Sequence, residues 1–212
     1  LGKTVQAKLI LLGRTPLPAK DAWTAWLSGH AADDQTSRKI ARLQQIESYG
    51  AEVLVCSAEV SDREQMQVAV RSAAERFGPI DGVIHAAGVP GGGAIQLKSR
   101  EAAMAVLRAK VHGTRVLAEV LSEQHPDFLV LCSSVNAVVG GFGQVDYCAA
   151  NAFLDAFAHA HKACIGMTTI SVNWDIWGEV GMAVDTNVPE HLQEQRSIDL
   201  KQGITAREGQ EV

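Results

Sequence analysis

The chain has 212 residues, of which 47% are apolar and 20% are charged, and this is the composition of an ordinary globular protein. The length is sufficient for one domain with a substantial core. The formal net charge of −5 and the absence of a Lys/Arg run argue against a nucleic-acid surface, and no stretch of the sequence approaches the roughly 18 apolar residues of a membrane span.

Short apolar segments alternate with longer amphipathic ones along the chain. The apolar segments are rich in β-branched residues and predict strands at 7–14, 51–60, 80–89, 127–135 and 167–177. The amphipathic segments predict helices at 37–50, 61–78, 99–122 and 147–163. Gly50 is expected to end the first helix, and Ser61 or Asp62 to begin the second. This alternation predicts a Rossmann-like doubly wound parallel sheet with helices on both faces.

We expect residues 1–212 to be a single domain within a longer polypeptide, because both ends look like interrupted elements. The polar segment 15–35 is expected to be a surface insertion. Its two tryptophans, in DAWTAWL, predict that it packs on something, either as a tucked loop or against a partner domain. The cysteines lack metal-ligand spacing and are interpreted as reduced thiols of an intracellular, cytoplasmic protein; they are Cys56, Cys132, Cys148 and Cys164.

In a doubly wound fold the ligand binds beyond the carboxyl ends of the strands. Arg14 follows the first strand, where it either binds the phosphate of a 2′-phosphorylated nucleotide or is a solvated arginine. Glu59 follows the second strand and either faces an adenine or caps the next helix. The small residues 86–88 follow the third strand, where they either let a ribose or nicotinamide approach the backbone or form a tight turn that needs Gly88.

Tyr147 and Asn151 lie one turn apart at the start of the last predicted helix, just after a glycine-rich loop. A tyrosine phenol has an ordinary pKa of about 10 and is a weak proton donor unless a cation lies near it. Lys110, among apolar and small residues on the preceding helix, is the candidate for that cation, although a single helical lysine is usually solvated. Ser133 and Ser134 end the fourth strand, and we expect one of them to be structural.

Together these residues resemble the ketoreductase domain of modular polyketide synthases, a branch of the short-chain dehydrogenase/reductase superfamily. The resemblance runs from about residue 3 to the end and is carried by the motifs LLGR, AEVSD, GVIHAAGV, KVHGT, SSV, GQVDYCAANAFLDAFA and SVNWDIWGEVGMA. Most short-chain reductases place a lysine four residues after the tyrosine. In this branch an asparagine takes that position and an upstream lysine serves instead, which is the order of Lys110, Tyr147 and Asn151.

The resemblance implies NADPH-dependent reduction of the β-keto group of a polyketide intermediate on an acyl carrier protein, with neighbouring synthase domains as further partners. It implies that Tyr147 protonates the carbonyl oxygen and that Ser134 hydrogen-bonds the same oxygen. Lys110 would hold the nicotinamide ribose and strengthen the acid, and Asn151 would orient Lys110 or a water in the proton path. The residues implied for the cofactor pocket are Arg14 at the 2′-phosphate, Glu59, Val60, Ala86, Ala87 and Gly88, with Lys110 and Tyr147 at the nicotinamide.

Three features depart from the family pattern. The glycine-rich turn that binds the pyrophosphate is absent, so the strand at 7–14 corresponds to the second strand of the family, and the chain by itself is expected to bind NADPH poorly unless a longer parent supplies the turn. Glu59 replaces the usual aspartate. VPGGG and Val139 stand where a Leu-Asp-Asp motif or a tryptophan would mark the product configuration, which is therefore left open.

Two alternatives to a synthase reductase are considered. A non-catalytic, ketoreductase-like scaffold within a synthase module is favoured by the missing turn and disfavoured by the joint presence of Lys110 and Tyr147. A free-standing short-chain reductase for small ketones is disfavoured by the interrupted ends and by the exchanged lysine and asparagine.

Overall fold

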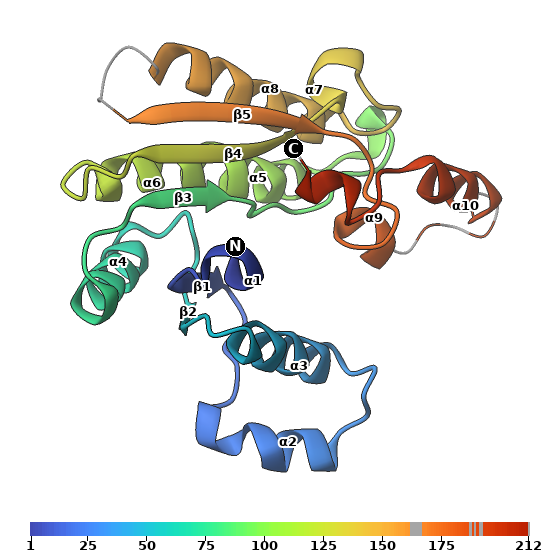
Figure 1. Ribbon diagram of the computed structural model, residues 1–212. Helices are drawn as coiled ribbons and strands as arrows, with labels where there is room; N and C mark the ends of the chain where they lie inside the picture. The colour runs from blue at the N-terminus through green and yellow to red at the C-terminus, as the bar shows by residue number, and fades with distance from the viewer. Residues whose placement is uncertain (162–166, 187, 189, 191–192, 212) are drawn as a thin grey trace. The chain divides into compact units, whose positions relative to one another are not determined.

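The computed structural model describes residues 1–161, 167–186, 188, 190 and 193–211 (Figure 1). The chain divides into two compact units, Leu1–Ile80 and Asp81–Val212, and each is described by itself. The expectation that 1–212 is one domain stays a prediction. Cys164 and the end of the helix predicted at 147–163 lie outside the described residues, whereas the other three cysteines are free thiols.

The first unit contains two parallel strands and the helices connected to them. Its elements are α1 (Gly2–Val5), β1 (Leu9–Gly13), η1 (Lys20–Ala22), α2 (Trp23–Gly29), α3 (Gln35–Ser48), β2 (Val53–Ser57) and α4 (Arg63–Phe77). β1 pairs with β2 in register from Leu9 opposite Val53. Both α3 and α4 pack against β2. β1, α3, β2 and α4 follow the β-α-β-α order predicted from the sequence, whereas η1 and α2 are helices that were not predicted within the segment 15–35.

Local signals in the sequence explain where these helices begin and end. α4 begins after Asp62, whose carboxylate accepts a hydrogen bond from the Gln65 N–H at 3.0 Å, as expected for an N-cap. Gly50, just after α3, has φ of +88°, a conformation that favours glycine. Trp23, in the segment 15–35, is buried against Ile40 of α3, so this segment is tucked onto its own unit.

The second unit contains a three-stranded parallel sheet in the order β3-β4-β5. Its elements are β3 (Gly82–His85), η2 (Ile95–Leu97), α5 (Arg100–Leu107), η3 (Arg108–His112), α6 (Gly113–Leu121), β4 (Phe128–Ser134), α7 (Asn136–Val139), α8 (Val145–His161), β5 (Thr168–Trp174), α9 (Met182–Asp185), α10 (Gln193–Gln202) and η5 (Glu208–Gln210). The segments α5, η3 and α6 follow one another without a break and form the crossover from β3 to β4, and α8 forms the crossover from β4 to β5.

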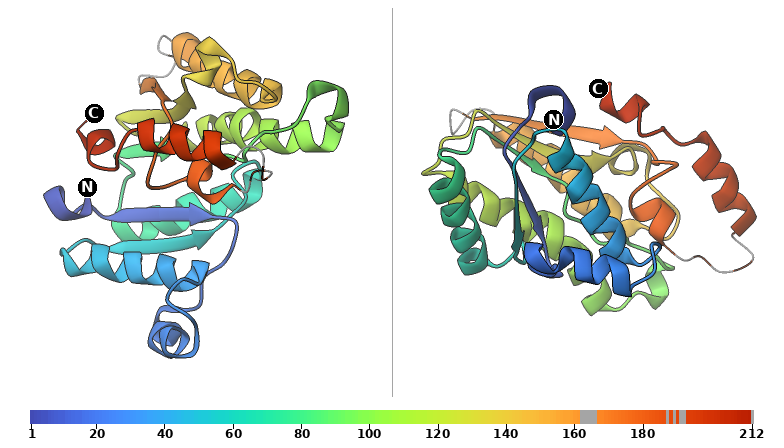
Figure 2. Two further views of the ribbon diagram at one scale, coloured as in Figure 1. Left: turned by 90° about the vertical axis from the view of Figure 1, so that its right-hand side faces the viewer. Right: turned by 60° about the horizontal axis from the view of Figure 1, so that its bottom comes forward.

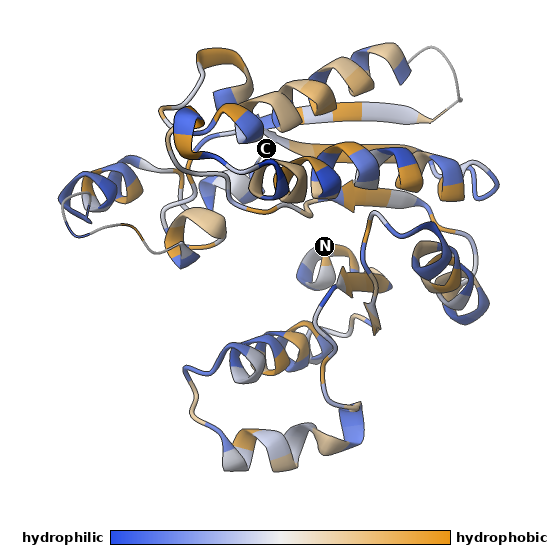
Figure 3. Ribbon diagram, turned by 180° about the vertical axis from the view of Figure 1, so that it is seen from behind, coloured by the Kyte–Doolittle hydropathy of each residue, from blue (hydrophilic) through white to orange (hydrophobic). Residues whose placement is uncertain are grey.

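These crossover helices cover one face of the three-stranded sheet (Figures 1 and 2). Leu129 and Leu131 of β4 and Leu154 of α8 are fully buried between them. The helices carry hydrophobic residues interrupted by hydrophilic ones, as amphipathic helices should (Figure 3). Successive side chains of a strand point to opposite faces of the sheet. Ile84 and Ile170 lie on the face opposite to Leu129 and Leu131, and they are 53% and 47% exposed. The expected helix layer on both faces is therefore present on one face within this unit.

The predicted fold class is confirmed: all five predicted strands exist, they are parallel, and helices connect them. The strands form two sheets in the described residues. One sheet contains β1 and β2, the other contains β3, β4 and β5, and no hydrogen-bonded ladder joins the two sheets there. Within the described ranges, none of the helices combines the length and the apolar character that a bilayer crossing requires.

The buried position of Leu154 predicts a large loss of stability on truncation. Leu154→Ala should lower the free energy of unfolding by about 2–5 kcal/mol, because it leaves a cavity between α8 and β4. Leu97→Ala, the same substitution at a residue that is 86% exposed, should change it by less than about 0.5 kcal/mol. Urea unfolding followed by tryptophan fluorescence measures both, and equal effects would contradict this core assignment.

Candidate active site

Lys110 lies on a π-helical turn in the middle of the helix predicted at 99–122. The turn, η3, lies between α5 and α6, and the hydroxyl of Thr114 on α6 donates to the Lys110 carbonyl. Such turns are uncommon and occur frequently at functional sites. The sequence predicted the helix but gave no signal for the π turn. Lys110 is only 3% exposed, so it is not the solvated lysine that its helical position alone would suggest.

The Lys110 ammonium is held at the carboxyl end of β4 and faces Tyr147. Nζ donates a 2.7 Å hydrogen bond to the Cys132 carbonyl and lies 5.9 Å from the centroid of the Tyr147 ring. Burial lowers the pKa of Lys110 to about 8, and the side chains of Cys132 and Asp155 offset part of this shift. Because an ammonium has three protons and one is used, two remain for further acceptors. The structure therefore brings Lys110 and Tyr147 together, and the catalytic roles of the two residues stay predictions.

Tyr147 and Asn151 occupy the first turns of α8, as predicted. The Asn151 side-chain nitrogen donates to the Tyr147 carbonyl at 2.8 Å, and Asn151 is completely buried. Among the described residues its Oδ1 has no hydrogen-bond partner, which is costly for a buried oxygen unless a water donates to it. Asp155, one turn further along α8, accepts a 2.6 Å hydrogen bond from the Ser171 hydroxyl on β5.

The two serines at the end of β4 have different environments. Ser133 donates to the Asn151 carbonyl at 3.2 Å and so ties β4 to α8. This is the structural role expected for one of the pair. The Ser134 hydroxyl accepts a hydrogen bond from the Asn136 N–H at 3.3 Å and retains its own proton for a ligand. Ser134 is 8% exposed, and its assignment as the catalytic serine stays a prediction.

The end of β3 lies beside Lys110. A Cβ added to Gly88 would be 3.4 Å from Lys110 Cε and 3.4 Å from Met182 Cε, which is ordinary contact. Gly88 does not have a positive φ, so its backbone does not support the alternative of a turn that needs glycine. Ala86 and Ala87 are exposed, and small side chains here leave room for a flat ligand.

His85, which sequence reasoning did not single out, is a buried neutral neighbour of Lys110. Burial, followed by the positive charge of Lys110, lowers the pKa of His85 to about 4. An imidazole that stays neutral at pH 7 adds no second cation next to Lys110. The signal was available in the sequence, since His85 directly precedes the 86–88 segment.

The residues predicted for the nucleotide end of the cofactor lie in the first unit. The Arg14 side chain is 65% exposed, and its Nε lies 4.0 Å from Glu59 Oε2. The Glu59 carboxylate also accepts weak hydrogen bonds from Ser61, at 3.4 Å from its N–H and 3.3 Å from its hydroxyl, just before α4. The N-cap of α4 is Asp62, so the interpretation of Glu59 as the cap of that helix is not supported, and its contact to an adenine stays a prediction. Val60 is half-buried next to it.

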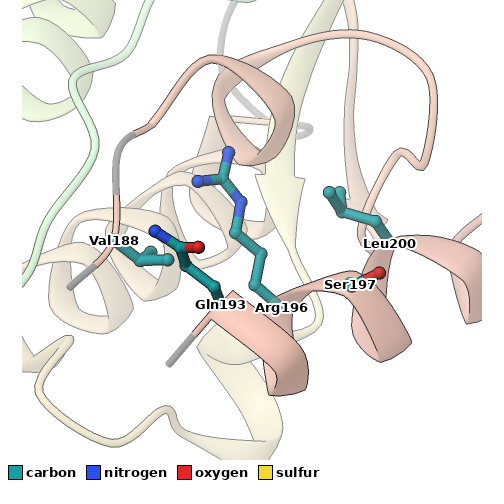
Figure 4. Close-up of a pocket in the computed structure, with 5 residues that line it drawn as sticks. All are labelled: Val188, Gln193, Arg196, Ser197 and Leu200. Atoms are coloured by element: carbon teal, nitrogen blue, oxygen red, sulfur yellow. The ribbon is translucent and has the colours of Figure 1, made fainter. Parts of the chain in front are cut away.

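A cavity of about 240 Å³ lies against α10 and is lined by Val188, Gln193, Arg196, Ser197 and Leu200 (Figure 4). The Arg196 guanidinium reaches from α10 to α9, where it donates to the carbonyls of Ala183 and Val184. α9 begins with Met182, whose Cε would lie 3.4 Å from a Cβ at Gly88. The sequence did not predict this cavity. No group of three or more metal-ligating side chains is found in the part of the chain that the structure describes.

A parallel α/β fold with a buried lysine beside a helical tyrosine is the arrangement expected of the short-chain dehydrogenase/reductase class. Residues 1–179 match the family model described as the KR domain, and the chain therefore belongs to this family of ketoreductase domains. Domains of this family use nicotinamide cofactors. The predicted resemblance is confirmed.

The relatives of the chain are polyketide synthases. It is 36% identical over 179 residues to polyketide synthase PksL of Bacillus subtilis, covering 82% of this chain and 4% of the relative. It is 32% identical over 208 residues to PksM of the same organism, covering 96% of this chain and again 4% of the relative. The chain thus spans about one twenty-fifth of the length of these relatives.

Solved structures of ketoreductases have the same fold. A ketoreductase domain from the bacillaene assembly line has a TM-score of 0.76 at 30% identity, covering 99% of this chain and 46% of that one. An N-terminal ketoreductase from the macrolactin assembly line has a TM-score of 0.70 at 30% identity, covering 83% of this chain and 33% of that one.

The buried charge of Lys110 predicts a pH-dependent cost in stability. Its folded pKa, about 8, lies below the ordinary value of 10.5, so the unfolded chain binds this proton more tightly. The cost is present at neutral pH and disappears as the pH rises through 8 to above 10. Lys110→Met should therefore raise the free energy of unfolding relative to wild type, and this increase should be about 2 kcal/mol larger at pH 7 than at pH 10.

Urea unfolding at the two pH values measures this difference. The control is Lys201→Met at an exposed position, which should change the free energy of unfolding equally at both pH values. A Lys110→Met effect that is independent of pH would mean that the ammonium is solvated.

Proposed function

We propose that this domain reduces the β-keto group of a polyketide intermediate, held as a thioester on an acyl carrier protein, to a β-hydroxyacyl thioester with NADPH. The observation that carries the proposal is the buried Lys110 ammonium 5.9 Å from the Tyr147 ring centroid. A structural scaffold has no physical need for this arrangement, because burying an ammonium costs free energy. Membership of the KR domain family supports the reaction class.

The residues of the second unit fit a dihydronicotinamide and a ketone. The two remaining protons of Lys110 suit ribose hydroxyls, and Gly88 leaves open the space beside it. NADPH, when bound, would supply the hydride that attacks the carbonyl carbon. Tyr147 gives its phenolic proton to the carbonyl oxygen, and the Lys110 charge stabilises the phenolate that remains. Ser134 donates a hydrogen bond to the same oxygen.

Asn151 completes the proposed proton path. Its buried Oδ1 lacks a partner, and a water that donates to this oxygen would have the hydrogen-bonding environment that a relay to Lys110 requires. Asn151 Nδ2 is already used on the Tyr147 carbonyl, so the side chain also fixes the turn that carries the phenol.

For the nucleotide end of the cofactor we propose that Arg14 binds the 2′-phosphate and that Glu59 and Val60 line the adenine pocket. The exposed guanidinium of Arg14 is available for a bidentate contact to a phosphate. The glycine-rich pyrophosphate turn of the family is absent from the sequence, and we propose that a longer parent chain supplies it.

The proposed setting is a multidomain synthase in the cytoplasm. Relatives many times longer than this chain support neighbouring synthase domains as partners. The three described cysteines are unpaired, which fits a reducing compartment. The thioester substrate would arrive on the phosphopantetheine arm of the carrier protein.

Tyr147→Phe tests the reaction. In the full-length parent protein, supplied with NADPH and a β-ketoacyl thioester, the variant should lose about 10²- to 10⁴-fold in kcat while NADPH affinity hardly changes, because only the proton donor is removed. Tyr49→Phe is the matched control, since the Tyr49 hydroxyl only accepts from Gln45 at the surface, and it should retain full activity. Loss of dihydronicotinamide absorbance measures turnover.

Near-full turnover in Tyr147→Phe would show that another group is the acid. A wild-type parent that folds and binds NADPH but does not oxidise it with the thioester would favour the scaffold.

Arg14→Ala tests the cofactor preference. It should weaken NADPH binding about tenfold and leave NADH binding unchanged, because only NADPH carries the 2′-phosphate. Arg207→Ala, which removes an exposed arginine paired with Glu211, should alter neither. Cofactor fluorescence titration of the parent protein measures both constants, and an equal loss for the two cofactors would remove Arg14 from this role.

A further inference from the structure

A buried ion pair lies next to the proposed proton donor. The ammonium of Lys98, in the link between η2 and α5, donates to Asp146 Oδ2 at 2.8 Å and to the Gly92 carbonyl at 2.6 Å. The Lys98 and Asp146 side chains are only 6% and 3% exposed. Asp146 directly precedes Tyr147 in the first turn of α8. The pair therefore joins the segment after β3 to the beginning of α8.

The second carboxylate oxygen of Asp146 is also used. Oδ1 accepts a 2.9 Å hydrogen bond from the Tyr147 N–H, so one carboxylate holds both the lysine and the backbone of the proposed acid. N–H groups in the first helical turn lack intrahelical acceptors, and a carboxylate is a favourable partner for one.

The glycine segment 91–93 packs against the same turn. A Cβ on Gly91 would lie 2.8 Å from Asp146 Oδ1 and 2.8 Å from Tyr147 Cβ, a distance that real side chains do not tolerate. A Cβ on Gly143 would lie 3.3 Å from the Gly93 carbonyl, so the loop before α8 also touches this segment. The backbone of the 91–93 segment therefore lies directly beside Tyr147.

A buried ion pair is a poor source of net stability, because desolvation of both charges offsets their attraction. Apolar side chains of similar size would fill this space at lower cost. Each charge here instead has a backbone partner, which is Gly92 for Lys98 and the proposed acid Tyr147 for Asp146, and Gly92 follows Gly91, which lies against Tyr147. This arrangement sets the position of backbone segments more than it adds stability.

We propose that Lys98 and Asp146 are positioning residues that hold the 91–93 segment against the first turn of α8 and thereby fix the Tyr147 phenol for proton transfer. The inference rests on the proposed function of Tyr147. Neither residue touches the reacting atoms. They act through the Tyr147 backbone and through the 91–93 segment, which limits how the ketone lies beside the phenol.

The test uses Lys98→Met, Asp146→Asn and the double variant in the full-length parent protein. Each single change should lower kcat about 10- to 100-fold by loosening the acid, with the dissociation constant of NADPH unchanged. The double variant should be no worse than the poorer single variant, because a single change leaves a buried charge without its partner and the double change does not. Lys20→Met, Glu47→Gln and their double variant, at an exposed ion pair, are matched controls that should retain activity.

Hydrogen exchange gives a readout independent of catalysis. Amides in 91–93 and the Tyr147 N–H should exchange faster in both single variants, while amides of β4 stay protected. A general loss of stability would raise exchange throughout the unit and lower kcat only in proportion to the unfolded fraction, and this result would overturn the proposal. Should a single variant fail to fold, the double variant and the other single variant carry the same comparison.

The two proposals fail in different ways. If the wild-type parent lacks reductase activity, the proposed function fails. Faster exchange confined to 91–93 and Tyr147 would then still show that the Lys98–Asp146 pair holds this segment in place. If wild type is active and both single variants keep its kcat and its exchange pattern, the proposed function stands and the positioning role is wrong.

Discussion

The burial of one ammonium group governs the arrangement of the second unit. In a medium less polar than water the charge of Lys110 acts more strongly on the neighbouring phenol, and removing that charge from water costs free energy. The pKa of about 8 reflects this balance, since Lys110 remains mostly charged at neutral pH. The fold supports the charge with one backbone carbonyl, that of Cys132, and with the more distant carboxylate of Asp155.

Several elements cooperate to hold that charge beside Tyr147. The π turn η3 places Lys110 within a helix that would otherwise continue regularly, and β4 presents the carbonyl that receives it. α8 supplies Tyr147 and Asn151 from one face, and Ser133 ties that helix to β4. His85 adds no charge, because it stays neutral. Gly88 has no side chain, and a Cβ at this position would meet Lys110 Cε at 3.4 Å.

The sequence predicted the parts of this site that depend on local pattern. Alternating apolar and amphipathic segments located all five strands, and Asp62 and Gly50 marked helix ends, since these signals are short-range. Lys110 could be singled out only in combination with Tyr147 and Asn151. The pairing of Lys98 with Asp146 spans 48 residues, and the π turn depends on packing, so neither leaves a local signature. Within the described part of the second unit the crossover helices cover one face of the sheet, and Ile84 and Ile170 on the other face are partly exposed, although the strands are uniformly apolar.

The missing pyrophosphate turn can be placed in the strand order under the proposed function. Doubly wound nucleotide-binding folds have the strand order 3-2-1-4-5-6. If β1 and β2 correspond to the second and third strands of that order, β3 corresponds to the fourth. The glycine-rich turn follows the first strand, which has no counterpart among the described strands. Under the proposed function, the pyrophosphate contact is therefore the part of cofactor binding that no described element supplies, whereas Arg14 and Lys110 supply the contacts to the 2′-phosphate and to the nicotinamide ribose.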